Sequence, residues 1–175
     1  MVTTLVLCVQ LYCPRTPTPT KVGWSIADNR ADSNASTGTN SNLKVMNATS
    51  NGGELRGSMT TFGLGKTHDG KNIGAYSIYT STGEVTANGA TVEPIRTAVT
   101  AGAGMSRWQK ANGGTIANKD LGLMSVSSAG KTDPIAVTSV SFPLNISLAV
   151  ENLKKLSLKE DTEFDGQATI SVVYL

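Results

Sequence analysis

The sequence predicts an all-β protein built as a β-sandwich, and three observations support this. In residues 140–150 and residues 164–174, apolar or small side chains recur at every second position and the positions between them are mostly polar, as in strands with one buried face. The stretches between apolar segments are rich in Gly, Ser, Thr and Asn, which are turn-forming residues. Segments with helical periodicity are scarce. Short strands separated by such turns are typical of a β-sandwich.

The N-terminal residues 1–12 have the pattern of a strand, and a proline-rich stretch follows them. The residues on the regular apolar face of this strand are Leu5, Leu7, Val9 and Leu11. Its other face is partly apolar too, which favours burial on both sides or burial by a partner. Residues 13–20 carry three prolines and are predicted to be an extended linker or a corner between sheets. Residues 21–175 then form one sandwich domain.

The middle of the chain predicts further strands with loops between them. Residues 22–27 form a short strand that carries Trp24, which we assign to the core rather than to an exposed sugar-stacking platform. The polar residues 28–42 are expected to be a surface loop with almost nothing to bury. Residues 72–80 are the next clear strand, whereas residues 91–108 fit a helical turn and strands equally well.

The last two predicted strands are the longest. Residues 140–150 alternate without a miss, and Pro143 within them has no backbone N–H to donate. We expect Pro143 to lie where that strand has no neighbour, or at a bulge. Residues 164–174 span roughly 36 Å at about 3.3 Å per residue, and they are expected to form a half-buried core strand.

Residues 164–175, FDGQATISVVYL, resemble the C-terminal strand of chaperone–usher fimbrial subunits. That strand has an aromatic residue, small or apolar residues at every second position, and a penultimate Tyr. The residues at the corresponding places here are Phe164, Ala168, Ile170, Val172 and Tyr174. Residues 72–83 and 87–90 are similar to a glycine-containing block in the middle of the same subunits.

The resemblance implies an immunoglobulin-like sandwich that is incomplete, because its final strand comes from another molecule. A periplasmic chaperone supplies that strand first, and the N-terminal extension of the next subunit replaces it. Four large apolar residues of the terminal strand left without cover would cost on the order of 6–12 kcal/mol, which is comparable to the stability of a whole domain. The isolated subunit is therefore expected to be unstable or to aggregate.

The function implied is that of a structural subunit of a bacterial fimbria, or pilus, that supports adhesion to surfaces or host cells. Its expected partners are neighbouring copies in a homopolymer, the periplasmic chaperone, the outer-membrane usher and a host glycan or protein receptor. The expected location is the extracellular cell surface, reached through the periplasm. The alternative from another class is a structural β-sandwich protein of a virion or a phage tail.

Two roles remain open for the strand that contains Leu5, Leu7, Val9 and Leu11. It is either the donor strand that fills the groove of a neighbouring subunit or the first strand of its own sandwich. Residues 1–4 lack the basic residue of a signal peptide. Either a signal lies upstream of Met1, or the protein is not exported by that route.

Composition and motifs argue against catalysis, cofactors, metals and nucleic acid. The formal net charge is +2 and charged residues make up 16% of the chain, too little for a nucleic-acid surface. His68 is the single histidine, so neither a metal site nor a nucleophile with its base can be assembled around it. We therefore predict no catalytic, cofactor-binding or metal-binding residues.

Overall fold

The structure is a computed structural model that describes residues 5–12, 18–37, 43–46, 53–100, 104–112, 114–118, 121–156 and 162–175, with the backbone alone for 5–12, 99 and 100. It confirms the all-β fold class. The elements, in chain order, are β1 (Leu5–Tyr12), β2 (Val22–Asp28), η1 (Ala31–Ser33), β3 (Val45–Met46), β4 (Glu54–Leu55), β5 (Phe62–Gly63), β6 (Gly74–Thr80), η2 (Thr82–Glu84), β7 (Thr86–Ala87), β8 (Ala90–Thr91), β9 (Glu93–Thr100), β10 (Gly104–Met105), β11 (Gln109–Lys110), β12 (Gly122–Ser127), β13 (Ser139–Val150), α1 (Leu153–Leu156) and β14 (Ala168–Tyr174).

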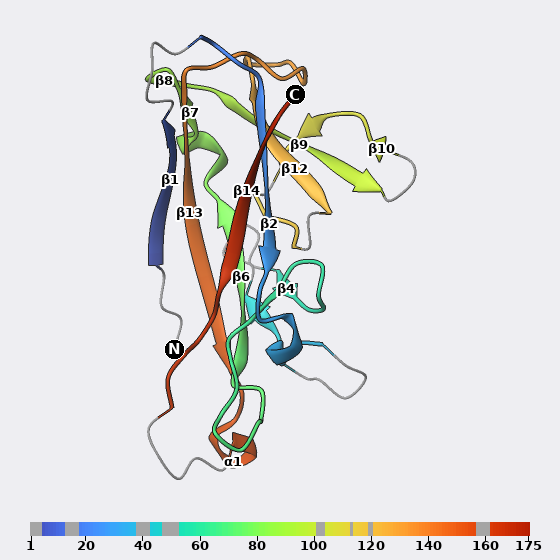
Figure 1. Cartoon of the computed structure of the whole chain (residues 1–175), viewed down its shortest axis with the longest axis vertical. Coiled ribbons are helices and arrows are strands. Elements are labelled where there is room, and N and C mark those ends of the chain that lie inside the picture. The colour runs from blue at the N-terminus through green and yellow to red at the C-terminus, as the bar shows by residue number, and fades with distance from the viewer. Residues whose placement is uncertain are drawn as a thin grey trace.

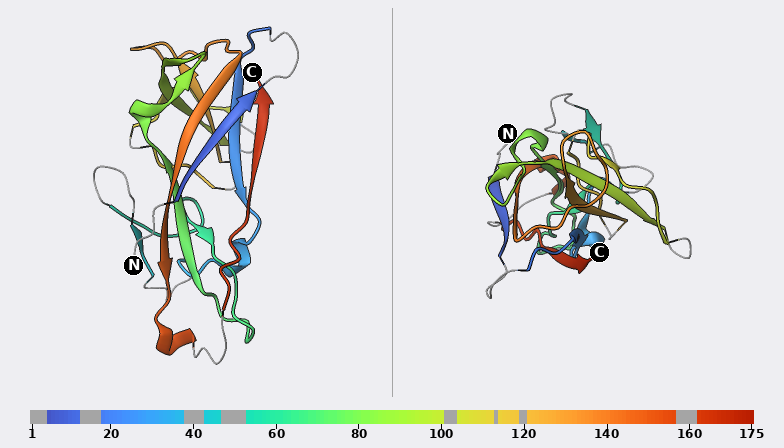
Figure 2. Two further views of the ribbon diagram at one scale, coloured as in Figure 1. Left: turned by 90° about the vertical axis from the view of Figure 1, so that its left-hand side faces the viewer. Right: turned by 90° about the horizontal axis from the view of Figure 1, so that it is seen from above.

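Two antiparallel sheets form the sandwich (Figure 1). One sheet has the order β5-β6-β13-β7-β8, with β1 paired to β13. The other has the order β10-β9-β12-β2-β14, with β11 paired to β9. Figure 2 shows β1 running beside β13 at the side of the sandwich. The predicted linker at residues 13–20 lies mostly outside the described residues.

The core lies between the sheets and is centred on one aromatic contact. Trp24 of β2 and Phe142 of β13 meet edge to face, with ring centroids 5.2 Å apart, and each is 1% exposed. A second aromatic pair, Phe62 and Tyr76, stacks at the same centroid distance. Because Trp24 is buried, its assignment to the core is confirmed.

β13 pairs with three other strands, β1, β6 and β7. Its residues 144–150 pair with β6 and its residues 140 and 141 pair with β7, whereas residues 139–146 pair with β1. Residues 140, 141 and 144–146 of β13 pair both with β1 and with β7 or β6. β1 therefore lies on one side of β13, and β6 and β7 lie on the other. Pro143 falls in the gap between the β6 and β7 ladders, and on the β1 side it lies opposite Cys8. Pro143 therefore removes no hydrogen bond from the ladders with β6 and β7.

The predicted eleven-residue strand at residues 164–174 is wrong in its first part, since β14 begins at Ala168. β2 ends at Asp28, opposite Ala168, so residues further upstream have no ladder partner. They form hydrogen bonds with loop residues instead. For example, the backbone N–H of Asp165 donates to the backbone carbonyl of Leu64 at 3.0 Å. Phe164 lies outside the strand and is 59% exposed.

The polar stretch after β2 buries more than its composition suggested. Asn34 and Ser36 are 1% and 4% exposed. The Asn34 side-chain amide donates to the carbonyl and to the hydroxyl of Thr61, at 3.0 and 2.9 Å. The Ser36 hydroxyl lies 2.6 Å from the same Thr61 hydroxyl. These buried polar groups form hydrogen bonds with one another, as buried polar groups in folded proteins do. The described part of this loop, residues 28–37, is therefore an ordered part of the domain.

Candidate interaction surface

The C-terminal strand β14 is the edge of its sheet. Its seven residues pair with β2, from Ala168 opposite Asp28 to Tyr174 opposite Val22. Within the described ranges no strand pairs with its other side. An unpaired edge of this length presents free N–H and C=O groups to another strand. Among the described strands, β14 therefore has one unpaired edge.

Four of the five residues predicted to line a polymerisation groove share one face of β14. Ala168 and Ile170 pack against the core, opposite Asp28 and Ile26. Val172 and Tyr174 lie on the same face but are 45% and 81% exposed. The core-side face therefore runs from partly buried to exposed toward the C-terminus.

A shallow groove that the sequence did not predict lies mainly along the other face of β14 and reaches Tyr174 at the end of the strand. Its volume is about 580 Å³. Its lining residues are Ser25, Met105, Leu123, Ser171, Val173, Tyr174 and Leu175. Met105 is 55% exposed and Leu175 is 39% exposed. Met105 falls in residues 91–108, for which the sequence favoured no single structure, so its position next to β14 had no sequence signal.

The predicted donor segment is joined to β13 rather than to β14. β1 runs antiparallel to β13 through eight residue pairs, from Leu5 opposite Ile146 to Tyr12 opposite Ser139. The side chains of Leu5, Leu7, Val9 and Leu11 lie outside the described part of the structure. The regular alternation of residues 140–150 predicted β13, the strand that pairs with β1. The sequence did not predict the pairing itself.

Charged groups form exposed pairs that lie on the surface. Lys66 donates to Asp32 at 2.7 Å, and this hydrogen bond holds the pKa of the Asp32 carboxyl below its ordinary value. Lys110 lowers the pKa of Glu93 in the same way, mainly through a hydrogen bond. Pairs of this kind contribute little to stability. The side chain of His68 is 91% exposed, as expected for a turn.

The described residues contain no group of His, Cys, Asp or Glu side chains arranged to hold a metal ion. No helix within the described ranges is long and apolar enough to cross a membrane. The chemically distinctive features of the described surface are therefore the open β14 edge and the exposed apolar residues around it. An open strand edge recognises another β-strand through backbone hydrogen bonds, and the neighbouring side chains select its sequence.

Tyr174→Lys is expected to reduce self-association of the isolated protein with a change in the free energy of unfolding below about 0.5 kcal/mol. The side chain is 81% exposed, and a lysine at an open edge discourages pairing with a second chain. Sedimentation velocity measures association and thermal melting measures stability. The matched control is Leu153→Lys, which places the same charge at a 69% exposed apolar position on α1. Equal association of both variants would contradict a role for β14.

Comparisons with known proteins give a family match and two relatives. A family model described as a protein of unknown function, DUF1120, matches residues 8–77. YhcF of Escherichia coli strain K12, an uncharacterized protein, is 34% identical over 128 residues, which cover 71% of this chain and 53% of YhcF. GltF of the same strain is 34% identical over 133 residues, 70% of this chain and 52% of GltF.

The chain therefore spans about half the length of the curated relatives it matches. No solved structure gives a significant match. The matches are consistent with a fimbrial-type family.

Proposed function

We propose that this protein is a structural subunit of an extracellular fimbria-type polymer, in which successive copies are joined by strand exchange. The observation that carries the proposal is the eight-pair ladder between β1 and β13. β1 is followed by the proline-rich residues 13–20, which the sequence predicts to be extended. A terminal strand on such a connection can pair with β13 of a neighbouring copy through the same ladder.

Exchange of β1 gives an open chain of subunits rather than a closed dimer when each copy donates to the next. Such a head-to-tail contact is heterologous, and it produces a filament unless its rotation closes a ring. The β1–β13 pairs are the same within one copy and between copies, so the exchange needs no new interface. This fits a structural role without a catalytic step.

In this proposal the subunit reaches the cell surface through the periplasm, with a chaperone and an outer-membrane usher as assembly partners. Before β1 of the next copy arrives, the β13 edge and the open β14 edge both need cover, because unpaired edges promote aggregation. The polymer supports adhesion to surfaces or host cells, where a glycan or a protein is the receptor.

A disulfide trap across the ladder tests the exchange. Gln10 and Ser141 lie directly opposite each other, and opposed residues of an antiparallel pair are close enough for a disulfide. In a protein with Cys8 and Cys13 replaced by serine, Gln10→Cys combined with Ser141→Cys is expected to give a ladder of covalent multimers. Non-reducing electrophoresis of the polymer isolated from cells measures it.

The matched control carries Gln10→Cys alone, which can link two copies at most. If the double variant runs only as a monomer with an internal disulfide, β1 belongs to its own sandwich and the proposed polymer is wrong. A covalent ladder together with viral or phage particles, rather than surface filaments, would support the alternative class of structural protein.

A further inference from the structure

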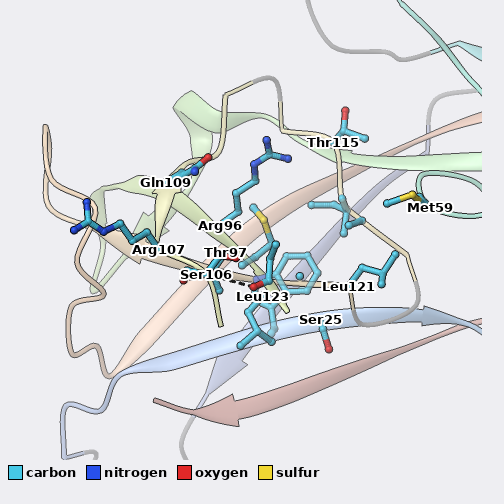
Figure 3. A pocket seen from close by; sticks show the side chains of 16 residues that line it. Ser25, Met59, Arg96, Thr97, Ser106, Arg107, Gln109, Thr115, Leu121 and Leu123 are labelled. Carbon is cyan, nitrogen blue, oxygen red and sulfur yellow. Dashed lines mark hydrogen bonds between the residues drawn. The ribbon is translucent and has the colours of Figure 1, made fainter. Parts of the chain in front are cut away.

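A pocket of about 310 Å³ lies against strands β2, β9 and β12 (Figure 3). Its other walls come from Met59, residues 115–117, Leu121 and three residues between β10 and the start of β11, namely Ser106, Arg107 and Gln109. The Thr97 hydroxyl donates to the Ser106 carbonyl at 2.6 Å, which ties one of these walls to β9. The volume is at the small end of the range of about 300–1,000 Å³ for small-molecule sites.

One row of residues crosses three strands at this pocket. Arg96 of β9 lies opposite Met124 of β12, and Met124 lies opposite Trp24 of β2. Residues directly opposed in antiparallel strands point to the same face, with Cβ atoms about 5 Å apart. Met124 and Trp24 are 5% and 1% exposed, whereas Arg96 is exposed. The row thus has a buried apolar end and, about 10 Å away, a cationic end in contact with solvent.

The polar atoms at both ends of this row have no partner among the described residues. The indole Nε1 of Trp24 is buried and no described residue accepts a hydrogen bond from it, although a buried indole N–H usually has a partner. No hydrogen bond or ion pair holds the Arg96 guanidinium within the described part of the chain. No aspartate or glutamate is among the described residues that line the pocket. An unpaired guanidinium beside an apolar floor suits an anionic group that carries an apolar body.

We propose that this pocket binds a small carboxylate with an apolar body, such as an arylalkyl carboxylate. Arg96 holds the carboxylate at the mouth, and Met124 and Trp24 form the apolar floor for the rest of the ligand. The guanidinium fork matches a carboxylate in shape and charge. The ligand's apolar part also covers the more exposed apolar lining, such as Met59, which is 63% exposed.

Arg107 also lines the pocket, yet it is a less suitable anchor. In Figure 3 the Arg96 side chain rises between Gln109 and Thr115, whereas Arg107 extends to the opposite side, away from Leu121. Arg107 also lies in a connection rather than on a strand. Arg107→Gln is therefore the matched control for Arg96→Gln, since both remove one exposed positive charge from the same region.

The test uses the full chain, with 3-phenylpropionate as the probe and 3-phenylpropanamide as its uncharged analogue. The wild-type protein is expected to bind the carboxylate at least about tenfold more tightly than the amide, because hydrogen bonds to charged groups exceed neutral ones by that order. Arg96→Gln removes this preference and leaves amide binding unchanged. Arg107→Gln keeps it. Two-dimensional ¹H–¹⁵N spectra report whether the Trp24 indole signal shifts, with Trp108→Phe used to assign the two indole signals.

Three results would overturn the proposal. One is equal affinity for carboxylate and amide in the wild-type protein, or no binding of either. Another is a preference for the carboxylate that survives Arg96→Gln. The third is binding that leaves the Trp24 indole signal in place. Thermal melting of both glutamine variants checks that the fold is intact, and neither is expected to lower the melting temperature, since Arg96 and Arg107 are exposed.

Discussion

Deletion of residues 1–12 is expected to lower the free energy of unfolding by about 5 kcal/mol and the melting temperature by about 10–20 °C. The deletion removes all eight pairs between β1 and β13 and leaves residues 139–146 as an unpaired edge. Directly behind this edge lie Val140, Phe142 and Leu144, which are 1–3% exposed in the intact chain. Thermal melting and size-exclusion chromatography measure the loss of stability and the aggregation that an open edge causes.

A synthetic peptide of residues 3–12 is expected to restore the melting temperature of the shortened protein. A ligand that binds the folded state alone raises stability with its concentration, so the recovery should increase as peptide is added. The control peptide carries Val9→Pro, which removes a backbone donor from the middle of the strand. If the shortened protein melts at the same temperature as the full chain, β1 does not complete the sandwich. If it is destabilised and the peptide gives no recovery, β1 cannot pair from a separate molecule, and strand exchange is ruled out.

The strands with regular alternation were predictable because the side-chain pattern along each strand marks the face that is buried. Residues 140–150 alternate without a miss, and the structure has β13 from Ser139 to Val150. The burial of Trp24 followed from the usual burial of tryptophan side chains in folded proteins. Neither prediction needed knowledge of distant contacts.

Other features depend on contacts that the sequence does not reveal. The alternation at residues 164–167 is real, but β2 ends too early to pair with it. Within residues 91–108 the structure has β9 and β10. β12 pairs with residues 93–98 of β9 and β10 pairs with its last two residues, and tertiary pairing decides such balanced cases. The pocket beside Arg96 depends on a row of residues that crosses three strands. Predicting it would have required the pairing registers of β12 with β2 and with β9.

Phe142→Ala is expected to lower the free energy of unfolding by about 3–5 kcal/mol, the usual loss for a buried Phe truncated to Ala. Phe142 is 1% exposed and contacts Trp24 at a centroid distance of 5.2 Å. The substitution leaves a cavity between the two sheets and removes the edge-to-face contact. Urea unfolding followed by tryptophan fluorescence measures the change, with an unchanged slope expected for a purely energetic effect.

The matched control is Phe164→Ala, which makes the same chemical change at a 59% exposed position. Its expected loss is below about 0.5 kcal/mol. The pair therefore separates two assignments of the aromatic residues. If Phe164→Ala costs as much as Phe142→Ala, Phe164 is buried in the folded protein in solution, and the eleven-residue core strand predicted from the sequence is correct after all. If the costs differ as expected, the sandwich is held together at β13 while the segment before β14 stays on the surface.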